Sequence, residues 1–324
     1  MSPQTWSAST NTVDLSSTVR GLWLDTWAAR ATAAISARGV RVLLLKGAAI
    51  ATWLYEPIGL PRGYVDVDLL VAPRDVDVAL AVLGELGFRH AVPPRDRTPA
   101  MSHEWTLVGA GGAVMDLHER LLGIRRPADE AFELLWEGRD ALTVGGRVVA
   151  VLGIPDRTVH LALHRAASGT DVKAARDLTL ALDALHADVW ARALARADLL
   201  DCSAAVVGAL RLHPDAATLV AAGRSAEAAG GGDVELQMRL LGASPAGLAF
   251  ARFQAGSRNG QRGHVLRTVL FPGTARLRTL SPLARRGRLG LIAARLARPI
   301  QVGIGALPGW LEFRRAARAA GRPR

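Results

Sequence analysis

The chain has 324 residues, half of them hydrophobic, and a formal net charge of +11. This length and composition exclude a disordered protein and predict two domains, or one large domain with an appended region. A single cysteine, Cys202, excludes an internal disulfide, and no uncharged apolar run is long enough to cross a membrane. The first residues contain no secretory signal, so we expect a cytoplasmic protein.

The positive charge is concentrated at the C-terminal end of the chain. Residues 274–324 contain twelve arginines and one acidic residue, Glu312, so this segment accounts for the whole net charge. Leu and Ile separate the arginines, which favours helices packed on the rest of the protein. Contact with a polyanion, such as nucleic acid, acidic lipid or an anionic substrate, is the alternative.

Lysine is rare in this sequence, which contains only Lys46 and Lys173 beside 38 arginines. The ammonium group of lysine is a compact point charge, whereas the guanidinium group of arginine is a wide, planar fork. A lysine in a chain that otherwise uses arginine therefore indicates a position that requires a compact cation, such as a contact with phosphate.

The predicted elements follow a polar N-terminus, residues 1–15, which we expect to be disordered. Apolar residues at helical spacing predict a helix from Ser16 to Arg38, ended by a glycine. Residues 40–45 are apolar and β-branched, which predicts a buried strand, and a turn then leads into a short helix over residues 48–55.

Alternating and apolar patterns predict the other strands, over residues 64–71, 103–108, 113–118 and 147–152. A helix is predicted from Pro73 to about Leu86. Ala- and Leu-rich helices follow, over residues 155–168, 172–186, 188–199 and 201–211. We therefore predict three parts: an α/β domain over 16–153, a helical domain over 154–270 and a basic, helical C-terminal region over 271–324.

Two aspartates, Asp66 and Asp68, lie on the strand predicted over residues 64–71. Because side chains alternate along a strand, both carboxylates lie on one face, with Cα atoms about 7 Å apart. Unless that face is open to water, the pair requires cations, and hard divalent ions such as Mg²⁺ are the usual ones. The same spacing at Asp75 and Asp77 follows a proline at a helix start, where the helix dipole explains acidic residues.

A third carboxylate, Asp116, lies near the end of the strand predicted over residues 113–118. If this strand pairs beside the strand over residues 64–71, three carboxylates converge. Such a trio can hold two Mg²⁺ ions about 3.5–4 Å apart, one activating the attacking oxygen and one holding a triphosphate, as nucleotidyl transfer requires. Asp116 would also act as the base or position it.

Several short motifs between residues 45 and 118 resemble a known family. They are Leu45-Lys46-Gly47-Ala48-Ala49, Arg62, Asp66-Val67-Asp68-Leu69-Leu70-Val71, Gly87-Phe88 and Asp116-Leu117-His118. Together they are similar to the largely uncharacterised bacterial nucleotidyltransferase family within the polymerase-β-like superfamily. The resemblance implies an α+β fold, with a small mixed sheet and helices followed by a mostly helical domain. It also implies that Asp66, Asp68 and Asp116 bind metal and that the turn at Gly47 contacts nucleotide phosphates.

The turn at Gly47 departs from the superfamily pattern. The second position is usually Ser or Gly, whereas this chain has Ala48, which offers no hydroxyl. Phosphate contact would then depend on backbone N–H groups at the helix start and on the Lys46 ammonium. The alternative is an ordinary turn from a strand to a helix, because glycine is common at such turns.

Four further residues have both a functional and a structural interpretation. Arg62 and His118 are candidate partners of phosphate or carboxylate, and the alternatives are a solvated loop cation and a cap at the strand end. His160 and His164 lie four residues apart on a predicted helix and could bind metal. No Glu-x-x-His motif or cysteine accompanies them, so a structural role is favoured.

We therefore predict a metal-dependent nucleotidyltransferase that moves a nucleoside monophosphate from a nucleoside triphosphate, with ATP expected, to a small molecule, a peptide or a protein. Two Mg²⁺ ions are the expected cofactors. The alternative is a non-catalytic binding protein that retains the fold, such as an antitoxin-like protein or an accessory protein of a biosynthetic cluster. Three mutually repelling aspartates favour the enzyme, because a non-catalytic protein has no physical need for them.

Overall fold

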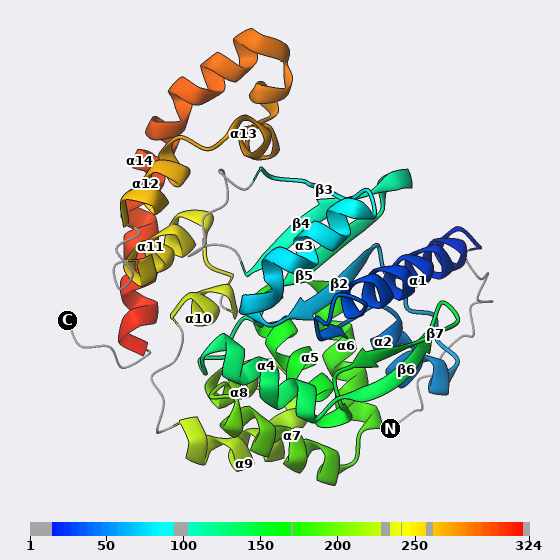
Figure 1. Ribbon diagram of the computed structural model, residues 1–324. Coiled ribbons are helices and arrows are strands. Elements are labelled where there is room, and N and C mark those ends of the chain that lie inside the picture. Colours follow the sequence, from blue (N-terminus) through cyan, green and yellow to red (C-terminus); the bar gives the residue numbers. More distant parts are fainter. Residues whose placement is uncertain are drawn as a thin grey trace.

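The computed structural model describes residues 15–93, 103–169, 171–227, 234–240, 242–256 and 262–319. The segment predicted to be disordered, residues 1–15, lies outside these ranges except for Leu15. A central sheet carries helices on both faces, and the C-terminal helices lie to one side of it (Figure 1). No helix within the described ranges is long and apolar enough to span a membrane.

The sheet has seven strands in the order β3-β4-β5-β2-β1-β7-β6. The strands are β1 Val42–Leu44, β2 Asp66–Val71, β3 Arg89–His90, β4 Glu104–Val108, β5 Val114–His118, β6 Asp140–Val144 and β7 Arg147–Val151. β1 pairs with β7 and β2 with β5 in parallel, whereas the other neighbouring strands are antiparallel. The predicted mixed sheet is confirmed.

Two strands were not predicted from the sequence, β3 and β6. β3 has only two residues at the edge of the sheet, too few for a pattern to appear. β6 joins β7 through Gly145 and Gly146, both with positive φ, which is the backbone that a two-residue hairpin requires. This Gly-Gly pair was the signal for β6.

One face of the sheet packs against α1 (Leu15–Ser36) and α3 (Val76–Glu85), which lie on the same side in Figure 1. Val67, Leu69 and Val71 point from β2 into this layer, where they join one apolar core with residues of both helices. The alternation along β2 therefore directs Asp66, Asp68 and Leu70 to the opposite face.

The opposite face packs against α5 (Ile154–Ser168), α6 (Val172–Ala184), α7 (Ala187–Leu199) and α8 (Ser203–Leu210), each within two residues of its predicted bounds. α4 (Ala128–Glu137) adds Phe132 and Leu135 to this larger core. The helix was not predicted, although Pro127 before it and two acidic residues in its first turn are typical of a helix start.

The described residues after α8 are mostly helical. The helices are α9 Ala217–Glu227, α10 Val234–Leu240, α11 Pro245–Gly256, α12 Arg262–Leu270, α13 Thr274–Leu280 and α14 Gly287–Ala319. α10, α11 and α14 share a small core that includes Met238, Ala251 and Ala316. The α+β class with a helical C-terminal part is thus confirmed, whereas the division at residues 153 and 270 stays a prediction.

Candidate functional site

The register between β2 and β5 brings two of the predicted carboxylates together. Asp68 is the direct neighbour of Asp116 across these parallel strands, and Val114 is the neighbour of Asp66. Asp66 lies two residues before Asp68 and therefore on the same face of the sheet. The three carboxylates thus share the face that is covered by α5.

A cleft of about 440 Å³ opens between these strands and the helices that cover them. Four of the predicted site residues line it, Lys46, Asp68, Asp116 and His118. The other four, Gly47, Ala48, Arg62 and Asp66, are not among its lining residues. α5 contributes His160 and His164 to the opposite wall, and α10 contributes Arg239.

Asp68 is the most enclosed of the three carboxylates, with only 3% of its surface exposed. Its Oδ1 atom lies 2.8 Å from Nζ of Lys46 and 3.0 Å from Nε2 of His118. Burial alone would raise the pKa of Asp68, but the Lys46 ammonium and the His118 ring lower it well below its ordinary value. Asp68 is therefore ionised, and Oδ2 carries neither of these contacts.

Asp116 and Asp66 behave in the opposite way. Burial, together with the nearby Glu104 and Asp68 carboxylates, raises the pKa of Asp116 to about 6 against the hydrogen bond from Thr106. Oδ1 of Asp116 is buried and has no hydrogen-bond partner in the described part of the chain. Burial and then repulsion from Asp68 raise the pKa of Asp66. Among the described residues, neither group has a direct ion pair such as the one between Asp68 and Lys46.

The turn at Lys46 and Gly47 joins β1 to α2 (Ala48–Ile50), which continues as a π-helical turn over Ala51–Tyr55. Gly47 has φ +60° and ψ −119°, a conformation that side chains disfavour, and a Cβ atom there would meet the ring of Tyr64 at 3.3 Å. No side chain caps the start of α2. The first N–H groups of this helix are therefore not used by a capping residue.

Arg62 does not extend into the cleft. Its Nε and Nη2 atoms donate to Oδ1 and Oδ2 of Asp177 on α6, at 3.0 and 2.7 Å, and both side chains are almost fully buried. The hydroxyl of Tyr55 also donates to Asp177, at 2.5 Å. Of the two partners considered for Arg62, the structure provides a carboxylate, which joins the sheet region to the covering helices.

Sequence reasoning missed Glu104 and did not single out His103. Glu104 faces His118 directly across antiparallel β4 and β5, and its Oε2 lies 3.5 Å from Nδ1 of His118. His103 precedes the strand, and its Nε2 lies 3.2 Å from the same oxygen. Burial opposes ionisation, but the hydrogen bond with His103 and the charge of His118 lower the pKa of Glu104 to about 2. The pairing of β4 with β5 was the signal, since both strands were predicted.

The two histidines of α5 lie in the wall of the cleft, with ring centroids 6.4 Å apart, His160 buried and His164 partly buried. Burial, followed by the charge of Lys46, lowers the pKa of His164 to about 4 and the pKa of His160 well below its ordinary value. Both rings are therefore neutral near pH 7, and the structural role favoured from the sequence stays a prediction.

The second lysine of the chain also lies near the carboxylates. Lys173 is exposed on α6, and its charge acts to lower the pKa of Asp66. No local sequence pattern predicts that Lys173 lies near the carboxylates, but the scarcity of lysine in the chain indicated that both lysines have a specific role. Both lysines of a chain with 38 arginines act on the paired aspartates of β2.

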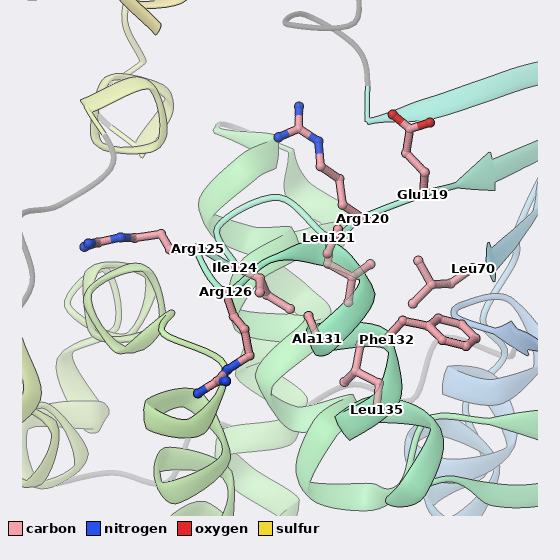
Figure 2. Close-up of a pocket in the computed structure, with 11 residues that line it drawn as sticks. Leu70, Glu119, Arg120, Leu121, Ile124, Arg125, Arg126, Ala131, Phe132 and Leu135 are labelled. Atoms are coloured by element: carbon pink, nitrogen blue, oxygen red, sulfur yellow. The ribbon is translucent and has the colours of Figure 1, made fainter. Parts of the chain in front are cut away.

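A second cavity, of about 230 Å³, lies between the loop after β5 and α4. Its floor is apolar and includes Leu70, Phe132 and Leu135. Figure 2 shows three arginines around it, and their guanidinium groups point away from one another and from the floor: Arg120, Arg125 and Arg126. The arrangement offers no converging set of cations for a phosphate, so we place the candidate site in the larger cleft.

Three comparisons relate the chain to known proteins. A family model described as "Uncharacterised nucleotidyltransferase" matches residues 15–215. One similar solved structure is the antibiotic-resistance factor ANT(2'')-Ia, with 15% sequence identity and a TM-score of 0.37; the match covers 66% of this chain and 95% of that chain. Another is an antigenic nucleotidyltransferase-like protein from Paracoccidioides brasiliensis, with 16% sequence identity and a TM-score of 0.35; the match covers 56% of this chain and 91% of that chain. No curated protein matches the chain.

Proposed function

Because this chain belongs to the family of uncharacterised nucleotidyltransferases, we propose that it transfers a nucleoside monophosphate from a nucleoside triphosphate to an acceptor, with Mg²⁺ as cofactor. Besides family membership, one structural observation supports the proposal, which is the arrangement of three carboxylates on the sheet. Asp68 and Asp116 are direct neighbours on two parallel strands, and Asp66 lies on the same face. Carboxylates held together on one sheet face are the ligands of metal-assisted phosphoryl transfer.

The donor atoms fit a hard divalent cation. Oδ1 of Asp116 is buried without a hydrogen-bond partner among the described residues, which is costly unless a cation or water satisfies it. Both contacts to Asp68 are on Oδ1, so Oδ2 is left for a metal ion. We therefore assign Asp66, Asp68 and Asp116 as the metal ligands. Two bound Mg²⁺ ions would supply polarisation of the acceptor oxygen and neutralisation of the triphosphate charge.

In the proposed reaction an acceptor oxygen forms a bond to the α-phosphorus, and the bond from that phosphorus to the bridging oxygen breaks. Pyrophosphate leaves, and the acceptor proton passes to Asp116. This carboxylate lines the cleft, and Oδ2 remains for the proton when Oδ1 is taken as the metal ligand. It can therefore reach a proton on a bound acceptor, as a general base must.

Lys46 and the start of α2 are the proposed phosphate contacts. The ammonium of Lys46 lies in the cleft beside Asp68, where it can also reach phosphate oxygens that share the metal. The start of α2 has no side-chain cap, and apart from the N–H of Ala49, which donates to the Lys46 carbonyl, its N–H groups are proposed as further donors. ATP is the nucleoside triphosphate that we expect. His118 holds Asp68 in place through its Nε2 atom.

Calorimetric titration with a non-hydrolysable analogue of each nucleoside triphosphate, with and without Mg²⁺, tests the proposal. We expect binding that depends on Mg²⁺ and is lost in an Asp66→Asn, Asp68→Asn protein. The chain provides a matched control in Asp75 and Asp77, which have the same spacing at the start of α3. The Asp75→Asn, Asp77→Asn protein should bind as the wild type does.

Two results would count against the proposal. Binding of a nucleotide that is unchanged by Mg²⁺ or by the substitutions at 66 and 68 would remove the metal assignment. No binding of any nucleotide would favour the non-catalytic protein that retains the fold.

A further inference from the structure

A cluster of two histidines and a glutamate lies in the cleft next to the three aspartates. The residues are His103, Glu104 and His118, and one ligand atom can be chosen from each so that all three atoms lie within 4.8 Å of one another. Glu104 Oε2 is 3.2 Å from Nε2 of His103 and 3.5 Å from Nδ1 of His118. All three residues line the cleft, so a bound species would be accessible to substrates.

These separations match the coordination of a transition metal. Ligands that bind zinc tetrahedrally at 2.0–2.1 Å lie ~3.3 Å from one another. The two distances to the Glu104 oxygen bracket this value. These two distances are therefore compatible with a shared ion.

The state of His118 provides an independent observation. Its side chain is only 6% exposed, yet Nδ1 makes no hydrogen bond to any described residue. A hydrogen bond to Glu104 would require a shorter approach than 3.5 Å. A buried ring nitrogen near a carboxylate, without a hydrogen bond, marks a place where a partner is missing.

Asp68 fixes the ring of His118 in the form that a metal needs. The Asp68 carboxylate is paired with Lys46, so it is ionised and can only accept hydrogen bonds. Nε2 of His118 therefore donates to Asp68 at 3.0 Å, and Nδ1 is the ring nitrogen that remains for a metal ion. A carboxylate behind a coordinating histidine is the usual arrangement in metal sites, where it orients the ring and raises its basicity.

We propose that His103, Glu104 and His118 bind one transition-metal ion of the zinc class, separate from the Mg²⁺ ligands of the proposed function. Two imidazoles and one carboxylate suit zinc and similar ions, whereas Mg²⁺ prefers oxygen ligands alone. Three protein ligands leave one coordination position, which would be open to an anionic or oxygen-bearing ligand in the cleft.

The local sequence explains how neighbouring residues can bind the same ion. Side chains of adjacent residues within a strand point to opposite faces. β4 begins at Glu104, so His103 lies just outside the strand. The alternation of strand side chains therefore does not force His103 to the face opposite Glu104. Glu104 is paired with His118 in the antiparallel register, which brings the Cβ atoms of the two residues to about 5 Å.

The test is equilibrium dialysis of the full chain against Zn²⁺ alone, without nucleotide, together with the visible spectrum of the Co²⁺-loaded protein. We expect one ion per chain and the intense visible bands of low-coordinate Co²⁺. His103→Ala and Glu104→Gln should each weaken Zn²⁺ binding by more than about tenfold. These two side chains are only partly buried, and circular dichroism would show that both variants are folded.

Control variants separate this site from other metal-binding groups. His186→Ala alters an exposed histidine at the start of α7 and should leave Zn²⁺ binding unchanged. His164→Ala tests the histidine pair of α5, and binding should again be retained. The sole cysteine, Cys202, is 2% exposed, so it does not compete with the proposed site for Zn²⁺.

Asp66→Asn distinguishes the two proposals. It should retain Zn²⁺ binding while it weakens nucleotide binding in Mg²⁺, so either proposal can fail without the other. The zinc site would be overturned if the wild type bound no stoichiometric Zn²⁺, or if His103→Ala and Glu104→Gln both bound it as tightly as the wild type. Loss of Zn²⁺ binding only in His164→Ala would likewise overturn it.

Discussion

Asp68 on β2 and Asp116 on β5 are direct neighbours across two parallel strands, although 48 positions separate them in the sequence. The two carboxylates have different hydrogen-bond partners. Asp68 is paired with a lysine and a histidine, whereas Asp116 has an oxygen without any hydrogen-bond partner among the described residues. The two groups can therefore have separate tasks, one held as an anion and the other available to a metal ion or a proton.

Asp116→Asn should remove catalysis and weaken nucleotide binding less than the Asp66→Asn, Asp68→Asn protein does, because two of the three proposed metal ligands remain. The amide has nearly the same shape as the carboxylate, but it cannot take a proton from an acceptor, a contribution worth about 10²–10⁴-fold in rate. Pyrophosphate release from ATP, with water in place of the acceptor, is the measurement. Asp75→Asn serves as the matched control at the start of α3. An Asp116→Asn protein with the wild-type rate would exclude Asp116 as the base.

Lys46→Arg should weaken nucleotide binding even though it keeps the positive charge. Only 18% of the Lys46 side chain is exposed, and its Nζ lies 2.8 Å from Oδ1 of Asp68. The wider guanidinium group would compete for the space that phosphate needs. Lys173→Arg is the control because Lys173 is exposed on α6. We expect at least about a tenfold loss of affinity for Lys46→Arg alone, measured by calorimetry. Equal affinities for the two variants would refute the special role of Lys46.

Gly47→Ala should destabilise the protein by about 1–3 kcal/mol, the usual cost of a residue held in a backbone conformation reserved for glycine. The added Cβ would also lie 3.3 Å from the ring of Tyr64, which is fixed by a hydrogen bond to Asp25. Gly59→Ala is the control: its φ is +67°, but nothing lies within 4 Å of the new Cβ. Urea denaturation should show a larger loss for Gly47→Ala. A smaller loss than for Gly59→Ala would contradict this account.

Much of the fold was predictable from the sequence because the signals were local. The alternation over residues 64–71 placed Asp66 and Asp68 on one face of a strand, and this strand is present as β2. The helices over residues 155–211 were marked by their composition and breaks. The placement of Asp116 needed one more assumption, that its strand pairs with β2, and the parallel register fulfils it.

The rest of the cleft depends on contacts between distant parts of the chain, which no local pattern encodes. Glu104 becomes a neighbour of His118 only through the register of β4 with β5. Arg62 meets Asp177 across 115 positions, and nothing near Arg62 indicates a buried partner. The roles assigned to the predicted site residues remain predictions, which the experiments above test.

Breaking the ion pair between Arg62 and Asp177 should cost about 3–5 kcal/mol of unfolding free energy, because either single substitution leaves a buried charge without its partner. The side chains are 3% and 1% exposed. Arg62→Met and Asp177→Leu should each be strongly destabilising, and the double variant less so than the sum. Arg192→Met is the control, since its pair with Asp188 on α7 is exposed and should not change the melting temperature. Additive effects of the two single variants would refute this prediction.

The stability of the protein should fall as the pH decreases from about 6.5 to 4, in part because of His164. Burial lowers the pKa of His164 to about 4 in the folded protein, against an ordinary value near 6.5. In that interval the unfolded chain binds a proton that the folded protein does not, so acid favours unfolding by up to about 3 kcal/mol for this residue. Urea denaturation of His164→Gln at pH 7.5 and 4.5 is the measurement. The difference in stability between the two pH values should be smaller in the variant. An unchanged difference would show that His164 is not held neutral.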